Sequence, residues 1–190
     1  MLDGHGFEKV KAGIYKKQEE ERVFALVGLN LATKHGGLEI NMVVRLRFMD
    51  VDETVYDLLN EKEEGLITAT IAGNVGYVGD YGKYYVVYFD SDNEIERGVK
   101  ELETALIKLG FPFFRKNKSM QKLVNLLPTA RYVIPEQAAY RLPVALQLLG
   151  RKKEAIDYVE SKVKDEKSYS DPASERFRKF AKAFYAKYGE

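Results

Sequence analysis

Apolar and polar residues alternate along part of the first half of the chain, which is the pattern of β-strands. Between residues 38 and 48 every even position is apolar, whereas the odd positions include Arg45 and Arg47. A period of two buries one face of a strand and leaves the other in water. We therefore expect a half-buried strand here, with Arg45 and Arg47 facing solvent.

Other segments of this half also have strand character. Residues 22–31 are apolar on both faces, which predicts a central strand, and the next residues, ATKHGG, predict a hairpin turn. Shorter strands are predicted at residues 13–18, 65–71 and 83–89. Residues 50–61 predict a short helix that Asp50 or Asp52 caps.

After residue 89 the apolar period becomes helical. One stripe predicts a long helix, begun by a capping box of Ser91 and Glu94 and ended by Gly110. The stripe consists of Ile95, Val99, Leu102, Leu106 and Leu109. A loop should follow at residues 111–119, and then a short helix at residues 120–127.

The remaining residues predict helices only. Pro135 should begin one helix, which Pro143 should kink or restart, and a turn at Gly150 should join two helices as a hairpin. Asp171 should cap the last helix, whose apolar stripe is aromatic. We therefore predict an α+β fold, in which an antiparallel sheet of about five strands is packed by a long helix. The predicted domains are residues 1–127 and a helical tail at residues 128–190.

A stretch rich in glycine and tyrosine, IAGNVGYVGDYGKYYVVYF, occupies residues 71–89. Its glycines are spaced three apart, and Lys83 is followed by tyrosine, so both the P-loop and the dinucleotide-binding patterns fail. A connection within the sheet is the better interpretation. Whether Tyr77, Tyr81 and Tyr84 point into the core or outward stays open. If outward, they and the two strand arginines form the candidate interaction surface.

Charge is unevenly distributed along the chain. Residues 1–110 hold 13 Lys and Arg against 20 Asp and Glu, a net of −7, and residues 111–190 hold 17 against 9, a net of +8. The candidate basic patch consists of Arg151, Lys152, Lys153, Lys179 and Lys182. Nucleic-acid binding through this patch is one hypothesis, and an ordinary solvated helix face is the simpler interpretation.

The residue types that support catalysis show no arrangement typical of a known site. The chain has no cysteine, and no serine lies in a Gly-x-Ser-x-Gly elbow. The two histidines, His5 and His35, lie beside glycines, where we expect surface loops. We predict no catalytic residue, no cofactor and no metal ligand, although acid pairs that meet only in space keep a metal-assisted hydrolase as a further alternative. No apolar run reaches the length of a membrane helix, and a cytoplasmic location is expected.

Four stretches resemble a known family. They are GHGFEKVKAGIYKK, GLEINMVVRLRF, VGYVGDYGKYYVVYF and KLGFPFFRKNKS. Together they resemble bacterial domain-of-unknown-function family 4304 over about residues 5–127. In that family a helix usually precedes the Gly-Phe pair, so we expect the chain to be truncated or its start misassigned. The resemblance implies an antidote, or immunity protein, of a toxin system.

The function that these observations favour is protein binding without catalysis. The charge asymmetry and the tyrosine-rich stretch point to another protein as the partner. Nucleic-acid binding by the C-terminal helices is the first alternative, and the hydrolase is the second. A membrane partner is not expected.

Overall fold

The chain folds into two compact units, and the backbone passes between them three times. The computed structural model describes residues 1–34, 36–62, 68–79, 81–165 and 171–189. Unit 1 comprises residues 1–47 and 71–118, and unit 2 comprises residues 48–70 and 119–190. This division differs from the predicted boundary at residue 127, because the helix after the β-hairpin packs with the C-terminal helices.

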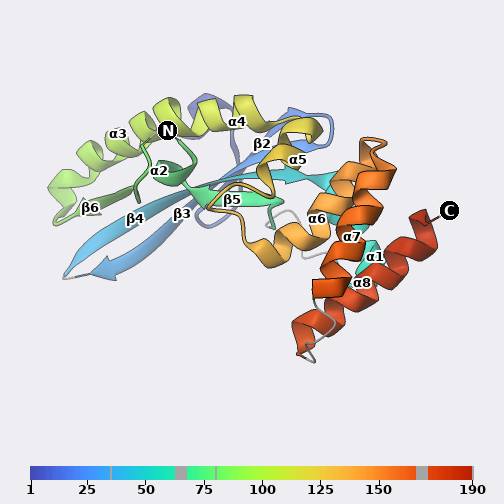
Figure 1. The fold of residues 1–190 in the computed structure, drawn as a ribbon. Coiled ribbons are helices and arrows are strands. Elements are labelled where there is room, and N and C mark those ends of the chain that lie inside the picture. Colours follow the sequence, from blue (N-terminus) through green and yellow to red (C-terminus); the bar gives the residue numbers. More distant parts are fainter. Residues whose placement is uncertain (35, 63–67, 80, 166–170, 190) are drawn as a thin grey trace. The chain divides into compact units, whose positions relative to one another are not determined.

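Unit 1 is built on an antiparallel sheet (Figure 1). Within the described residues its strands are β1 (Glu8–Lys11), β2 (Ile14–Glu20), β3 (Val23–Lys34), β4 (Gly37–Phe48), β5 (Ile71–Asn74) and β6 (Val86–Phe89). The strands follow the order β1-β2-β3-β4, and both β5 and β6 pair with the far edge of β4. The α+β class is confirmed. The sheet has one strand more than expected, because no strand is predicted at the position of β1.

The predicted strand at residues 38–48 is confirmed as β4, and its even face supplies the core of the sheet. Met42, Val44, Leu46 and Phe48 are at most 1% exposed. Burying such side chains contributes about 1.5–3 kcal/mol each. A one-residue slip would turn this face to water, so the alternation fixes the register of the strand.

Helical backbone covers one face of the sheet without interruption at Gly110 (Figure 1). Helix α3 (Ile95–Ala105) passes through a π-helical segment (Leu106–Gly110) into α4 (Phe111–Asn117). The prediction that Gly110 ends the helix and that a loop follows is therefore wrong. A methyl group at Gly110 would lie 2.7 Å from the end of the Leu106 side chain and 3.3 Å from Val44, so the glycine lets the helix pack closely against β4. Pro112 is the second residue of α4 and directly follows the π-helical segment, where the hydrogen-bond pattern departs from that of an α-helix.

Gly98 has a similar packing role, which a substitution can test. It lies in α3 against the ring of Phe89, and an added methyl group would overlap that ring. We expect Gly98→Ala to lower the free energy of unfolding by about 1–2 kcal/mol, because overpacking outweighs the gain in helix propensity. Urea unfolding measures the change. Gly4→Ala is the matched control, since a methyl group at Gly4 has no neighbour within 4 Å. An unchanged or increased stability of Gly98→Ala would contradict this packing role.

Within the described residues, unit 2 consists of helices. These are α1 (Met49–Leu59), α5 (Met120–Leu126), α6 (Pro135–Leu148), α7 (Lys152–Asp165) and α8 (Pro172–Tyr188). Pro135 begins α6 as expected, and the helix continues through Pro143 without restarting. The predicted helical hairpin is confirmed: Gly150 takes φ 75° between α6 and α7, and the amide of Arg151 donates to Leu146 O.

Aromatic side chains form the core of unit 2. The ring of Tyr140 lies 5.5 Å from that of Phe177 and 5.2 Å from that of Phe180, both edge to face. Phe180 also contacts Phe184, and these three phenylalanines of α8 are at most 2% exposed. The predicted stripe and cap of α8 are confirmed, since Asp171 Oδ1 accepts from the amide of Ala173 at 3.0 Å. No described helix is long and apolar enough to cross a membrane.

A buried polar network also holds unit 2 together. The prediction that Asp50 or Asp52 caps α1 is wrong, because the N-cap is Phe48, which makes no side-chain cap hydrogen bond. Instead Asp52 is 1% exposed and accepts from Arg141 Nε at 2.9 Å and from the Thr70 hydroxyl at 2.7 Å. Thr70 accepts from the amide of Phe48, and Arg141 donates to Gln137. The network therefore joins α1, α6 and the segment that leads into β5.

Candidate interaction surface

The glycine-tyrosine stretch interrupts an edge strand. Along β4, Val43 pairs with Asn74 at the end of β5, and Asn41 pairs with Val86 at the start of β6. β5 and β6 thus form two parts of one edge strand beside β4. Residues 75–85 lie between these two parts and depart from the sheet at the position opposite Met42. We call residues 75–85 the tyrosine loop; Asp80 in it lies outside the described residues.

The bounds of two predicted strands therefore differ from those expected. The strand predicted at residues 83–89 begins only at Val86. The strand predicted at residues 65–71 overlaps β5 only at Ile71, since β5 runs from Ile71 to Asn74 and residues 68–70 are not in a strand. Residues 65–67 lie outside the described part of the chain. Pairing with β4 ends where the tyrosine loop begins, and alternation of residue types alone does not mark that point.

Asn74 closes the base of the tyrosine loop. Its side-chain oxygen accepts from the amide of Gly76 at 3.0 Å and from that of Tyr85 at 2.8 Å. Its amide nitrogen donates to Tyr85 O at 2.8 Å and to Asn41 Oδ1 at 2.7 Å. These contacts use both donors and both acceptor positions of the side chain, which is 8% exposed. One residue thus ties the start of the loop to its end and to β4.

Close backbone packing supports this closure. A side chain at Gly76 would collide with the carbonyl oxygen of Lys83 and would lie 2.9 Å from Cβ of Tyr85. Glycine is therefore required where the two ends of the tyrosine loop meet. Short helix α2 (Val75–Val78) begins at this point, with Asn74 as its cap.

The tyrosines of the loop point outward, which answers the question that the sequence left open. Tyr77 is 50%, Tyr81 54% and Tyr84 47% exposed. The rings of Tyr77 and Tyr84 lie 6.1 Å apart, and Tyr81 meets Tyr85 edge to face at the same distance. Tyr85 is half-buried and donates to Glu101 O; burial, with smaller contributions from Glu101 and Tyr81, raises the pKa of its phenol.

The two strand arginines do not join this exposed surface. Arg47 is 0% exposed, so the prediction that it faces solvent is wrong. Arg45 is half-buried, and burial lowers the pKa of its guanidinium group. That group lies over Gly28, where a methyl group would be 3.0 Å from Nη2. Because Gly28 has no side chain, the Arg45 side chain can lie over it, on the face of the sheet that the alternation predicts to be exposed to solvent.

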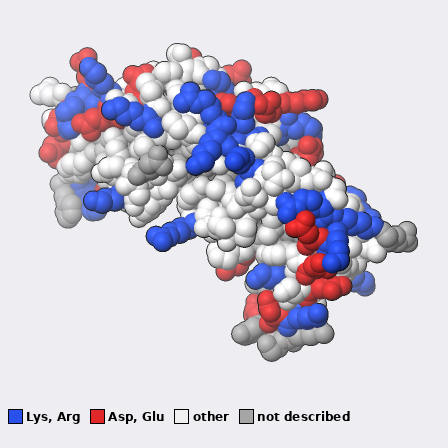
Figure 2. All heavy atoms as spheres, turned by 45° about the horizontal axis from the view of Figure 1, so that its top comes forward, with Lys and Arg blue, Asp and Glu red and all other residues white. Residues whose placement is uncertain are grey.

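The candidate basic patch lies in unit 2, where acidic residues accompany it. Arg151 makes paired hydrogen bonds to Glu154, and Lys153 lies 3.7 Å from Asp157, whereas Lys152, Lys179 and Lys182 are exposed. Basic and acidic atoms lie side by side at the lower right of Figure 2. Unit 1 contains 15 Lys and Arg residues and 13 Asp and Glu residues, and unit 2 contains 15 and 16. The units are therefore nearly neutral, with net charges of +2 and −1, so the large opposite charges of the sequence halves do not carry over to the units. Nucleic-acid binding gains no support from this distribution.

A second feature of unit 1 is an apolar groove, which the sequence analysis did not identify. It has a volume of about 410 Å³ and lies between the start of α3, the end of β6 and the β3–β4 hairpin. Ile95 is 50% and Val99 is 41% exposed there, so the stripe predicted as core is buried only in its second half. The groove is lined by Thr33, Gly36, Gly37, Leu38, Ile40, Phe89, Asp90, Ser91, Ile95 and Val99. Among the described residues of this lining, Asp90 is the one that is charged.

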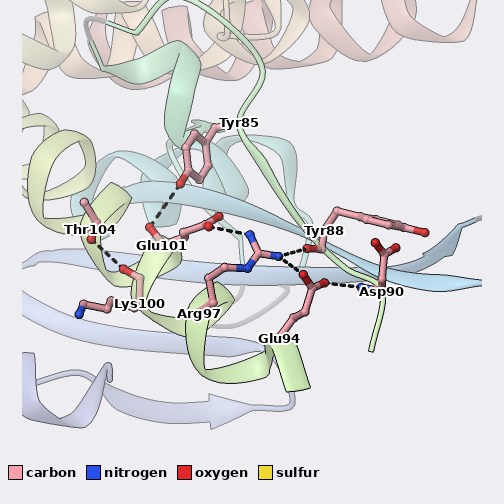
Figure 3. A network of polar contacts seen from close by, with 8 residues as sticks. All are labelled: Tyr85, Tyr88, Asp90, Glu94, Arg97, Lys100, Glu101 and Thr104. Carbon is pink, nitrogen blue, oxygen red and sulfur yellow. Dashed lines mark hydrogen bonds and ion pairs between the residues drawn. The ribbon is translucent and has the colours of Figure 1, made fainter. Parts of the chain in front are cut away.

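Polar contacts hold the start of α3 against β6 beside the groove (Figure 3). Arg97 donates to Glu101 and to Glu94, each at 2.8 Å, and its second terminal nitrogen also approaches Tyr88 O at 3.4 Å. Glu94 Oε2 accepts from the amide of Asp90 at 2.8 Å. The predicted capping box is therefore displaced by one residue, because a 3₁₀ turn (Asp92–Glu94) precedes α3. These contacts join the first turns of α3 to the end of β6, beside the groove.

The histidines and acidic residues do not form a metal site in the part of the chain that the structure describes. No group of three or more His, Asp or Glu side chains lies there in a suitable arrangement. His5 lies 3.0 Å from Glu103 and edge to face with Phe111, and His35 lies outside the described residues. The hydrolase alternative gains no support from these contacts.

No family model, no curated protein and no solved structure matches this chain. The resemblance to family 4304 stays a prediction.

Proposed function

We propose that this protein binds another protein without catalysing a reaction, and that the tyrosine loop supplies the contact. The observation that carries the proposal is the set of three half-exposed tyrosines on a backbone that Asn74 closes. Tyrosine is enriched at protein interfaces, because it offers a large apolar ring and a hydroxyl group with few rotatable bonds. A backbone that is ordered before binding loses little conformational entropy on association. An antidote that binds a toxin, the role that the family resemblance implies, is one instance of such a protein.

The test compares affinity purification of three tagged forms from the native host. Wild-type protein should recover one stoichiometric partner, and Tyr77→Ser/Tyr84→Ser should recover at least about tenfold less of it. Both tyrosines are exposed, so the double variant should keep its fold. Ile134→Ser is the matched control, because Ile134 is 53% exposed and lies in unit 2.

Two results would contradict the proposal. One is repeated recovery of the bare protein from all three forms. The other is recovery of the same partner in equal amounts by wild type and by the double tyrosine variant.

A further inference from the structure

Strand β3 extends beyond the strand that pairs with it. β2 pairs with β3 as far as Gly28, and one more bond joins the amide of Leu29 to Gly13 O. Residues 30–34 of β3 are exposed, and no described strand pairs with their outer edge. In Figure 1 the end of β3 extends beyond β2. This part of β3 is an open sheet edge.

Strand geometry identifies the backbone groups that lie free on the open edge. In an antiparallel pair, alternate residues direct their N–H and C=O groups to the same neighbour. Leu29 directs its amide to β2, so Leu31 and Thr33 direct theirs to the same side, where β2 has ended. The intervening Ala32 directs its groups toward β4. The open edge therefore offers two donors and two acceptors at Leu31 and Thr33.

The apolar groove adjoins this edge. Thr33 lines the groove, and Leu31 shares the face of Thr33 because side chains two apart on a strand lie on the same face. Leu31 is 60% exposed. A strand added beside β3 would therefore direct every second side chain toward an apolar surface that continues into the groove.

We propose that the open edge of β3 binds an extended polypeptide segment by strand addition, with alternate apolar side chains reaching the groove and a basic side chain near Asp90. Main-chain hydrogen bonds to Leu31 and Thr33 supply the pairing, and the groove selects the side chains. The basic residue follows from charge complementarity, since Asp90 is the one charged residue among the described residues that line the groove. This surface is distinct from the tyrosine loop, so the two proposals stand or fall separately.

The size of the edge favours a segment over a second copy of the chain. Five residues of strand span about 17 Å. Pairing two such edges would form a ladder too short for the roughly 1,200–2,000 Å² that a stable protein interface buries. A single extended segment needs only this ladder and the groove.

The test selects short random peptides, about ten residues long, from a displayed library against purified wild type. The selected peptides should alternate apolar and polar residues and carry Lys or Arg near one end. Thr33→Pro removes an amide of the open edge and should weaken peptide binding at least about tenfold. Thr33→Val keeps that amide and is the matched control, with affinity within about twofold of wild type. Val99→Glu changes an exposed groove residue, leaves the strand intact and should also weaken binding about tenfold.

Amide hydrogen exchange gives a second readout on wild-type protein. Bound peptide should slow exchange at Leu31 and Thr33 by about tenfold or more, and should leave Ala32, whose amide faces β4, nearly unchanged. The absence of enriched peptides, or equal binding to wild type, Thr33→Pro and Val99→Glu, would overturn the proposal. A dimer that Thr33→Pro converts to a monomer would assign the edge to a second copy and would also overturn it.

Discussion

Arg141→Met should lower the free energy of unfolding by about 3–5 kcal/mol. The substitution removes the cation that faces Asp52 and leaves that carboxylate 1% exposed, with the Thr70 hydroxyl as its remaining donor among the described residues. A buried charge without its counter-ion is far more costly than the pair itself is stabilising. Methionine keeps much of the aliphatic volume of arginine, so the loss should report the charge rather than a cavity.

Urea unfolding followed by far-UV circular dichroism measures this change, because the described part of unit 2 is helical. Arg131→Met is the matched control, since Arg131 is exposed and should change stability by no more than about 0.5 kcal/mol. Adding Asp52→Asn to Arg141→Met removes the unpaired buried carboxylate and should recover part of the lost free energy of unfolding. If Arg141→Met behaves like Arg131→Met, the ion pair does not stabilise unit 2.

Asn74→Ala should lower the free energy of unfolding by about 2–4 kcal/mol, the second largest effect that we expect. The alanine leaves two backbone amides and two acceptor oxygens without their partner at the base of the tyrosine loop. Exchange of the amides of Gly76 and Tyr85 should accelerate more than that of the paired amides in β4.

Asn74→Asp separates the hydrogen bonds that the Asn74 side chain donates from those that it accepts. An aspartate can still accept from Gly76 and Tyr85, but it cannot donate to Tyr85 O or to Asn41 Oδ1. We expect a loss close to that of the alanine variant, whereas Asn125→Ala, an exposed position in α5, should show none. Full stability of Asn74→Asp would mean that the two donated bonds contribute nothing.

Much of the fold could be predicted from local pattern. Alternation identified β4, the aromatic stripe identified α8, and Asp171 identified its cap, because each signal lies within a few residues of the element it describes. Gly110 was interpreted wrongly for a physical reason. Glycine ends helices, but it also lets backbones approach, and only the position of Val44 shows which role applies.

The candidate surfaces were predicted less well than the fold. The tyrosines were identified by composition, but their exposure depends on Asn74, which closes the loop with partners up to 33 positions away in sequence. The alternation predicts that Arg47 is exposed to solvent, because it describes a single strand and contains no information on the segments that pack over that strand. The groove was missed because Ile95 and Val99 continue a buried stripe, and their exposure reflects how far β3 and β4 extend. One feature of the sequence indicates the open edge beside the groove: the apolar segment at residues 22–31 is longer than the preceding predicted strand at residues 13–18, so part of it lacks a partner from that strand.

The threefold passage of the chain between the units has a consequence for folding during synthesis. Helix α1 packs with α6 and α8, yet the ribosome adds about 130 residues between the end of α1 and the end of α8. At typical elongation rates this interval is on the order of ten seconds. Throughout it, Val51, Val55 and Leu58, which the folded protein buries, lack their final neighbours. The nascent chain therefore exposes an apolar helix face until α8 has been synthesised, which makes this interval the period when chaperone binding to α1 is expected.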